Sequence, residues 1–309
     1  MRRVVFSEYG GPEVLRVEDA SRPEPGEGEL VIEVAAIGLS LPVVRSTHGG
    51  AQLPHVPGGE VVGRVVSIGS GVTGWRVGQR AAGLAFSGAY AEFAPVAASF
   101  LAPVPDDVDD ASAVALVRSG QVALGVLRAA ALQPGESVLI TGAAGGVGHL
   151  AVQLASVLGA RRVVAAVGSA AKASFLRDIG AGEVVTYDQP VGEPVDVVLD
   201  GVGGAVQEAG LECLAPLGRF VSYNAAGVAV DVNQLRFQAK TVIGFAMAHF
   251  ASRRPDVYAR HREELWKLCA GGQVRPAIHC TLPLERAAEG HRIIESRENL
   301  GKVVLNPTS

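Results

Sequence analysis

The sequence predicts an α/β protein in two parts, a compact irregular β-barrel and a doubly wound parallel sheet. Residues 1–117 carry β-branched runs separated by Gly and Pro, and helical segments are scarce there. Residues 118–255 alternate short apolar strands with segments of about 15–25 residues, which are long enough for crossover helices. Residues 256–309 are expected to return to the first part.

The length, composition and charge of the chain exclude several classes of protein. A length of 309 residues suggests about two domains. The hydrophobic share of 48% excludes a disordered chain, and 39 Gly with 17 Pro exclude a coiled coil. The net charge is −4 and no long basic stretch is present, so nucleic acid is not an expected partner.

The cysteines and the most apolar segment both indicate a cytoplasmic protein. Cys213, Cys269 and Cys280 are too few and too widely spaced for a disulfide framework or a CxxC zinc site, and suit a reducing compartment. Residues 137–160 contain no charged side chain, but five glycines argue against a membrane span. We interpret this segment as a strand, a glycine loop and a buried helix. The N-terminus lacks an apolar stretch of signal-peptide length, and no membrane partner is expected.

The expected elements follow from local patterns. Strands in the first part include 30–34 and 61–68, where β-branched residues lie between turns. The strands of the second part are expected at Ser137–Thr141, Arg162–Val167, Val195–Asp200 and Gly218–Tyr223. The last part predicts a helix at 256–270, strands at 278–282 and 302–305, and a helix at 284–296 between them. An apolar run at 241–247 predicts an edge strand, which would extend the sheet across a homodimer if it pairs with its own copy.

A glycine-rich turn carries the strongest chemical signal. The segment 138–148 runs from an apolar strand through Gly142-Ala143-Ala144-Gly145-Gly146-Val147-Gly148 into a helix. It fits Gly-x-Gly-x-x-Gly with Ala143 in the first place, and between a strand and a helix this pattern predicts a dinucleotide site. Gly145 would admit a pyrophosphate, and Gly148 would allow close helix–strand packing. The predicted contacts in the turn are Ala144, Gly145, Gly146, Val147 and Gly148. The alternative is a glycine turn without a ligand.

The residues after the second strand predict NADPH rather than NADH. No carboxylate that would repel a 2′-phosphate occurs in residues 162–173. Gly168 follows the strand, and Ser169 and Lys172 offer a hydrogen bond and a positive charge. For Lys172 the alternative is an exposed helix lysine.

Several segments together resemble the medium-chain dehydrogenase/reductase superfamily, in its zinc-free quinone oxidoreductase branch and close to the enoyl reductase domains of polyketide synthases. The matching segments are 57–65, 69–72, 88–93, the glycine loop and 299–305. The resemblance implies a GroES-like catalytic domain at 1–117 and 256–309, with an inserted Rossmann domain at 118–255 and a cleft between them. Zinc members carry Cys and His where this chain has Ser40 and Gly59, so no metal is expected.

The resemblance also implies further cofactor contacts. Tyr187 matches a Tyr near the adenosine phosphate, and Tyr223 with Asn224 lie on the nicotinamide side. Phe245 and Met247 would approach the nicotinamide amide through their backbone, and Lys302 matches the Gly-Lys-Val ending of the family. Ordinary packing is the alternative for each.

The first cleft loop departs from the family pattern. The family has Asn and Asp where this chain has Ser40 and Val43, and the family's Arg is replaced by Arg45, two residues early. A later Thr is replaced by Gln121. Enone reduction adds hydride at the β-carbon and moves negative charge to the carbonyl oxygen, which needs donors. The catalytic candidates are Ser40, Arg45, His48 and Tyr90. His48 is alternatively an exposed loop histidine, and water is an alternative proton source.

These features predict an NADPH-dependent, zinc-independent reductase of quinones or α,β-unsaturated carbonyl compounds. One alternative is a tailoring enzyme of polyketide-type secondary metabolism, reductive or cyclising without net redox change, since the cleft loop is more apolar than expected. The other is a non-catalytic NADPH-binding protein.

Overall fold

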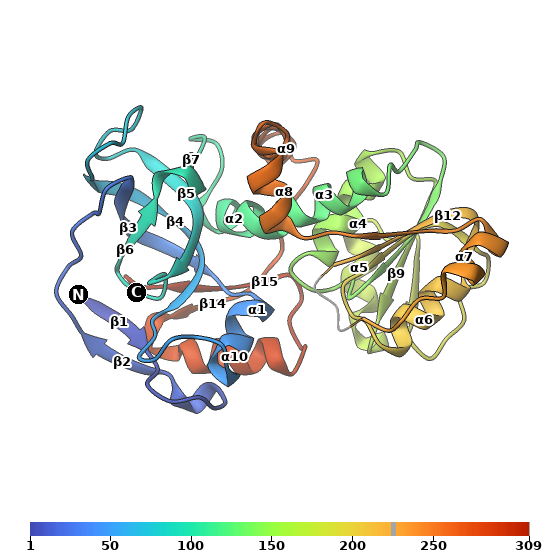
Figure 1. Ribbon diagram of the computed structural model, residues 1–309, viewed down its shortest axis with the longest axis horizontal. Helices are drawn as coiled ribbons and strands as arrows, with labels where there is room; N and C mark the ends of the chain where they lie inside the picture. The colour runs from blue at the N-terminus through green and yellow to red at the C-terminus, as the bar shows by residue number, and fades with distance from the viewer. Residues whose placement is uncertain (224–226, 309) are drawn as a thin grey trace. The chain divides into compact units, whose positions relative to one another are not determined.

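The computed structural model describes residues 1–223 and 227–308, and it divides into two compact units. Unit 1 comprises Met1–Arg118 and Pro276–Ser309, and unit 2 comprises Ser119–Arg275. Figure 1 shows a different architecture in each, and both termini lie in unit 1.

Unit 1 is built on a seven-stranded sheet in the order β14-β15-β3-β4-β5-β7, with β6 paired to β3. All of these pairs are antiparallel except β14 with β15, and a separate hairpin joins β1 to β2. The strands are β1 (Arg2–Val5), β2 (Arg16–Asp19), β3 (Glu29–Gly38), β4 (Pro57–Ile68), β5 (Arg80–Ser87), β6 (Phe93–Ala97), β7 (Leu101–Pro103), β14 (Ile278–Pro283) and β15 (Lys302–Asn306). Its α-helices are α1 (Leu41–Arg45), α2 (Asp110–Ala115) and α10 (Ala287–Glu295).

The central strand β3 organises the core of unit 1. Leu30, Ile32 and Val34 alternate along it and belong to one apolar core, while Val31, which points to the opposite face, is fully buried as well. Gly63 on β4 lies so close to β3 that a Cβ there would overlap the Glu33 carbonyl oxygen and lie 2.8 Å from Ile32 Cγ2. At Gly63 the backbone of β4 therefore lies against β3 with no room for a side chain between them.

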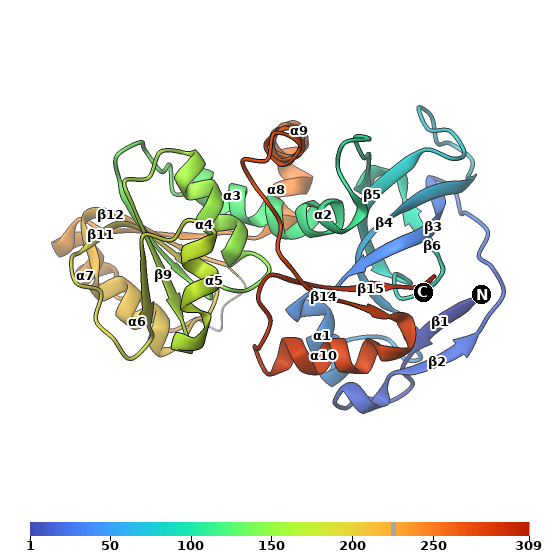
Figure 2. The ribbon, with the colours of Figure 1, turned by 180° about the vertical axis from the view of Figure 1, so that it is seen from behind.

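Unit 2 is a six-stranded parallel sheet in the order β10-β9-β8-β11-β12-β13, which is the doubly wound arrangement. Its strands are β8 (Ser137–Thr141), β9 (Arg162–Val167), β10 (Glu183–Thr186), β11 (Val195–Asp200), β12 (Leu214–Ser222) and β13 (Thr241–Gly244). Its α-helices are α3 (Gln121–Ala129), α4 (Gly148–Val157), α5 (Ala173–Asp178), α6 (Ala205–Glu212), α7 (Val232–Gln238), α8 (Met247–Arg253) and α9 (Pro255–Ala270). Helices flank the sheet, with α4 against β8 and β9 and α6 against β11 and β12 (Figures 1 and 2).

The fold class is confirmed, and β8, β9 and β11 have the bounds predicted from the sequence. Several bounds differ from the structure, since the strand expected at Gly218–Tyr223 is β12, Leu214–Ser222. The expected edge strand at 241–247 ends at Gly244, because α8 begins at Met247. Residues 256–275 cluster with unit 2 rather than with the returning segment, because α9 packs against α3 and α8.

The charge-free segment 137–160 forms β8, the glycine turn and α4, as interpreted from its glycines. Within residues 1–223 and 227–308, none of the helices has the length and apolar character needed to cross a bilayer.

The contact between β3 and β4 yields a stability prediction. Gly63→Ala should lower the free energy of unfolding by about 1–3 kcal/mol, because a rigid backbone oxygen must move to admit the methyl group. Gly192→Ala is the matched control, since a Cβ at Gly192 meets nothing within 4 Å. Urea denaturation of both variants checks this, and equal stabilities would contradict the packing described.

Candidate functional site

The topological switch point of unit 2 lies between β8 and β11. The chain leaves β8 through α4 toward β9, and it leaves β11 through α6 toward β12, so the two connections diverge from adjacent strands. In doubly wound sheets this divergence opens a crevice at the carboxyl ends of the strands, where ligands bind. The glycine turn follows β8 and therefore lies at this edge.

Two glycines of the turn have different roles. A Cβ at Gly148 would lie 2.6 Å from Ala143 Cα, so only glycine permits the first turn of α4 to pack against the end of β8. A Cβ at Gly145 would meet only the Gly142 carbonyl oxygen, at 3.3 Å. Gly142 has a φ of 60°, which favours glycine. The space beside Gly145 is thus open, and the first N–H groups of α4 have no partners inside the helix.

Thr141 and Asp200 tie the two switch-point strands together. Thr141 Oγ1 donates to Asp200 Oδ1 at 2.7 Å, and the Gly203 N–H donates to Asp200 Oδ2 at 3.1 Å. The Gly201 N–H donates to Thr141 Oγ1 at 3.1 Å. Asp200 is fully buried, and these donors satisfy its carboxylate. Sequence reasoning named neither residue as part of the site, although both are polar residues at the end of an apolar strand.

Two tyrosines predicted from resemblance reach the same edge. Tyr187 Oη accepts a hydrogen bond from the Gly142 N–H at 3.0 Å. The Tyr223 ring lies within 2.9 Å of where a Cβ of Gly201 would be, so it packs on the loop after β11. Burial raises the pKa of Tyr223, and the nearby Asp200 and Tyr187 raise it further. Asn224, predicted beside Tyr223, lies outside the described residues.

The end of β9 is open to solvent. Gly168 and Ser169 are exposed, and Ser169 Oγ accepts a hydrogen bond from the Ala171 N–H at 3.3 Å. Lys172 is half-buried at the end of a short 3₁₀ turn that precedes α5. The structure thus places Ser169 and Lys172 together after the second strand of the sheet.

Phe245 and Met247 follow the edge strand β13. The Phe245 N–H donates to the Ser222 carbonyl at 2.9 Å, and its ring lies 2.5 Å from where a Cβ of Gly125 would be. The Phe245 ring therefore packs against α3. Met247 is the first residue of α8. A contact of either backbone with a cofactor stays a prediction.

Lys302 lies in the interior of unit 1 in an ion pair. Its Nζ is 3.1 Å from Glu60 Oε2, and the two side chains are 1% and 0% exposed. Burial lowers the pKa of Lys302, and the adjacent Glu60 opposes that shift. The cofactor contact expected of Lys302 stays a prediction.

Of the four catalytic candidates, the structure gives Tyr90 the most enclosed place. Tyr90 is fully buried, and its Oη lies 3.0 Å from His291 Nε2. Burial raises the pKa of Tyr90 well above its usual value, and the negative charge of Glu60 adds to this. His291 was not named from the sequence, because only the fold brings α10 against the loop after β5.

The other three candidates lie around α1. Ser40 precedes α1 and is buried, and its Oγ has no hydrogen-bond partner among the described residues. Arg45 at the end of α1 is exposed. His48 is 52% exposed and pairs with Glu295 of α10, with Nε2 and Oε1 2.8 Å apart. Their roles in catalysis stay predictions.

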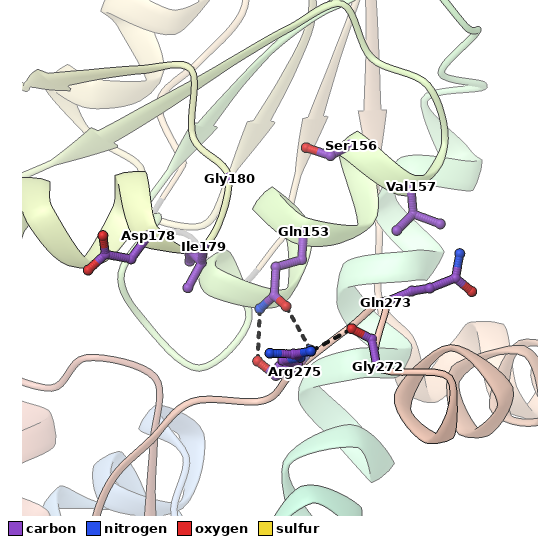
Figure 3. Close-up of a pocket in the computed structure, with 9 residues that line it drawn as sticks. All are labelled: Gln153, Ser156, Val157, Asp178, Ile179, Gly180, Gly272, Gln273 and Arg275. Carbon is purple, nitrogen blue, oxygen red and sulfur yellow. Dashed lines mark hydrogen bonds between the residues drawn. The ribbon is translucent and has the colours of Figure 1, made fainter.

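A surface cavity of unit 2 lies apart from all the predicted residues. It has a volume of about 310 Å³ and lies between α4, the end of α5 and the segment after α9 (Figure 3). In it, Gln153 exchanges two hydrogen bonds with the backbone of Arg275, at 3.0 and 2.7 Å. These two hydrogen bonds hold the segment after α9 against α4, within unit 2.

Two family models match separate parts of the chain. Residues 26–106 match the family model described as "Alcohol dehydrogenase GroES-like domain", and residues 178–305 match the one described as "Zinc-binding dehydrogenase". The Pseudomonas aeruginosa protein named "Quinone oxidoreductase" is 33% identical over 99% of both chains. The Burkholderia "2-haloacrylate reductase" is 30% identical over 98% of both chains.

Two further relatives, one of them a solved structure, match nearly all of this chain. The crystal structure of Escherichia coli quinone oxidoreductase complexed with NADPH has a TM-score of 0.91 and 29% identity, over 99% of this chain and 100% of that one. A mycocerosic acid synthase-like polyketide synthase of Mycolicibacterium smegmatis is 30% identical over 98% of this chain, which spans 15% of that synthase.

The residues present do not fit the metal that one family description implies. In the part of the chain that the structure describes, no group of three or more His, Cys, Asp or Glu side chains is placed to hold a metal ion. Ser40 and Gly59 supply no thiolate or imidazole, and the neighbouring carboxylate of Glu60 faces Lys302. A tetrahedral zinc site needs a donor set that these residues lack.

The buried His291 yields a prediction on acid stability. Burial, with a contribution from His48, lowers the pKa of His291 to about 4 from 6.5. Between pH 4 and pH 6.5, His291 is protonated in the unfolded chain but stays neutral in the folded chain. The free energy of unfolding should therefore fall as pH drops from about 6.5 to about 4, by up to about 3 kcal/mol.

Urea denaturation across this pH range checks the prediction. His291→Gln should flatten this part of the profile, whereas His279→Gln, which replaces an exposed histidine of the same unit, should not. An unchanged profile in His291→Gln would contradict the assignment.

Proposed function

This chain belongs to the quinone oxidoreductase-like branch of the medium-chain dehydrogenase/reductase superfamily, and on that premise we propose that it is an NADPH-dependent, metal-independent reductase. Its substrate is a quinone or an α,β-unsaturated carbonyl compound. The observation that carries this proposal is the glycine turn at the switch point of a six-stranded parallel sheet. The Escherichia coli relative that carries NADPH supports it.

The residues at the switch point fit a dinucleotide. The space beside Gly145 would admit a pyrophosphate, and N–H groups at the start of α4 would donate to it, other than that of His149, which donates to the Gly145 carbonyl oxygen at 3.1 Å. Ala144, Gly146, Val147 and Gly148 would complete this contact. NADPH, when bound, supplies the hydride, and the protein orients the reactants and stabilises the charge that develops.

The end of β9 favours NADPH over NADH. A 2′-phosphate bound there would meet Ser169 and Lys172 and no carboxylate from residues 162–173. Gly168 is exposed, and a Cβ there would lie 3.6 Å from the Tyr187 ring. Tyr187 would then border the adenosine phosphate, as the resemblance implies.

On the substrate side, we assign donors to the oxygen that receives negative charge. Ser40 precedes α1 and its hydroxyl has no hydrogen-bond partner among the described residues, while Arg45 ends α1 and His48 follows three residues later. Tyr90 would act through its hydrogen bond to His291. Donors aimed at a developing oxyanion typically lower the barrier by several kcal/mol.

A second candidate function is a tailoring step of polyketide-type secondary metabolism. The apolar composition of α1, with Val44 fully buried and Val43 against the core, favours it, and so does the similarity to a polyketide synthase. Product analysis with and without NADPH separates a reduction from a cyclisation, since a cyclisation without net redox change consumes no NADPH.

We also propose a homodimer. Strand β13 is at the end of the strand order and pairs with β12 on one side. Exposed strand edges pair readily with a second chain. Sedimentation of the purified chain tests this, and a monomer at micromolar concentration contradicts it.

The glycine turn provides the first test of the cofactor site. Gly145→Val should perturb the fold little, because a Cβ there has one close neighbour, the Gly142 carbonyl oxygen at 3.3 Å, but it should weaken NADPH binding about tenfold or more by filling the phosphate position. Titration calorimetry with NADPH measures this, with Gly192→Val as the control. Unchanged affinity would place the pyrophosphate elsewhere.

Lys172→Ala tests the nucleotide preference. The variant should lose about 10- to 100-fold in NADPH affinity and little in NADH affinity, which corresponds to one charge-assisted hydrogen bond. Lys267→Ala, an exposed lysine on α9, is the control. An unchanged ratio of the two affinities would remove Lys172 from the site.

The reaction itself is tested by following NADPH oxidation with a panel of quinones, enones and enoyl thioesters. Turnover of one class identifies the substrate type. Tight NADPH binding without turnover of any of them would contradict the reductase and favour a non-catalytic NADPH-binding protein.

A further inference from the structure

Strands β8 and β11 of unit 2 are joined at both of their ends by a hydroxyl and a carboxylate. At the amino ends, Ser137 Oγ donates to Asp196 Oδ2 at 2.7 Å, and the Asp196 N–H donates to Ser137 Oγ at 3.0 Å. At the carboxyl ends, Thr141 Oγ1 donates to Asp200 Oδ1 at 2.7 Å. The same pair of adjacent strands therefore has two similar links, and only the second lies at the end where ligands bind in doubly wound sheets.

The link at the amino ends serves the strands themselves. The Ser137 N–H also donates to Asp196 Oδ2, at 2.8 Å, so the two residues bind each other three times. Arg219 of β12 adds to this end, because its Nη1 donates to Glu136 Oε1 at 2.9 Å and to the Asp196 carbonyl oxygen at 3.4 Å. The alignment of β8, β11 and β12 thus has support that does not involve the carboxyl ends.

The link at the carboxyl ends also holds the loop that follows β11. The Val202 N–H donates to Asp200 Oδ1 at 3.1 Å, and the Gly203 N–H donates to Asp200 Oδ2 at 3.1 Å. The Gly201 N–H donates to Thr141 Oγ1 at 3.1 Å. Three successive N–H groups of the loop therefore bind this one pair of side chains, and Asp200 is fully buried.

The loop that Asp200 holds has a single side chain, that of Val202. Residues 201–204 read Gly-Val-Gly-Gly, and the last two glycines have φ of 83° and 58°, which favour glycine. A Cβ at Gly142 in the glycine turn would lie 3.4 Å from Val202 Cγ2. The Val202 side chain therefore lies against the glycine turn, at the point where the connections after β8 and β11 diverge.

We propose that Asp200 is a positioning residue for the dinucleotide, because it fixes the loop 201–203 and keeps Val202 against the glycine turn. This inference rests on the proposed reductase function. A pyrophosphate beside Gly145 would lie between the two diverging connections, so the position of this loop sets the space that the nucleotide has. A loop that is fixed before the nucleotide arrives also loses less conformational entropy when the nucleotide binds. Since Asp200 is buried, it acts through the loop.

A carboxylate suits this task better than an amide. Oδ1 of Asp200 accepts from the Thr141 hydroxyl and the Val202 N–H, and Oδ2 accepts from the Gly203 N–H. Hydrogen bonds to a charged acceptor are stronger than those to a neutral one. An Asn side chain has one acceptor oxygen and an NH₂ group, so one of these donors would face another donor. Asp200→Asn should therefore release part of the loop.

The experiment compares the two links. Thr141→Val and Asp200→Asn weaken the link at the carboxyl ends, and Ser137→Ala and Asp196→Asn weaken its counterpart at the amino ends. Both sets affect the same two strands, so the urea midpoint of unfolding should fall in all four variants. NADPH affinity, measured by titration calorimetry, should fall about tenfold or more in the first set and change less than about threefold in the second.

Thr141→Ser provides a rescue that a purely structural role would not predict. It keeps the hydroxyl that binds Asp200 and Gly201, whereas Thr141→Val keeps the shape of the side chain and loses that hydroxyl. The affinity of Thr141→Ser for NADPH should stay within about threefold of the wild type. If Asp200→Asn does not fold, the difference between the two Thr141 variants decides the question alone.

Equal losses of NADPH affinity in the two sets would overturn the inference in favour of a general stabilisation of the sheet. Equal affinities in Thr141→Val and Thr141→Ser would overturn it as well, since the hydroxyl would then have no effect on the nucleotide. If the wild type binds no NADPH, the proposed function fails, and this inference fails with it. If the wild type binds NADPH and the variants at the carboxyl ends match it, only this inference fails.

Discussion

The close approach of α4 to the end of β8 is the constraint on which the rest of unit 2 depends. Gly148 allows this approach because a Cβ there would collide with the backbone at Ala143. With the helix at this distance, its N-terminus lies at the switch point, and the loop leaves space beside Gly145. A longer separation would move the N–H groups away from any ligand at the strand ends.

The buried charged groups of the two units have different hydrogen-bond partners. In unit 2, Asp200 at the switch point accepts hydrogen bonds from Thr141 and from backbone N–H groups, so its charge is satisfied within the fold. In unit 1, Glu60 and Lys302 are equally buried and form an ion pair with each other at 3.1 Å, without a further hydrogen-bond partner among the described residues. A satisfied group fixes geometry, while an unsatisfied one retains the capacity to exchange hydrogen bonds or protons.

Local patterns predicted an element well where a single hydrophobic pattern runs through its whole length. The strands β8, β9 and β11 are buried and continuous, so their composition marks both ends. The strand β10 has four residues, of which one is buried, and it was not among the strands expected from composition. The predicted strand at 241–247 is longer than β13. Phe245 packs against α3 and Met247 begins α8, so the apolar residues at 245–247 do not continue the strand.

The sequence by itself determined the fold class and the place of the glycine turn, and it predicts a preference for NADPH over NADH. Each of these depends on residues close together in the chain. Only the tertiary structure decided which distant groups meet. Tyr90 and His291 are 201 residues apart, and Thr141 and Asp200 are 59 apart. The meeting of Lys302 with Glu60 depends on a glycine in a third strand. Strand order and register set these contacts, and no local pattern contains them.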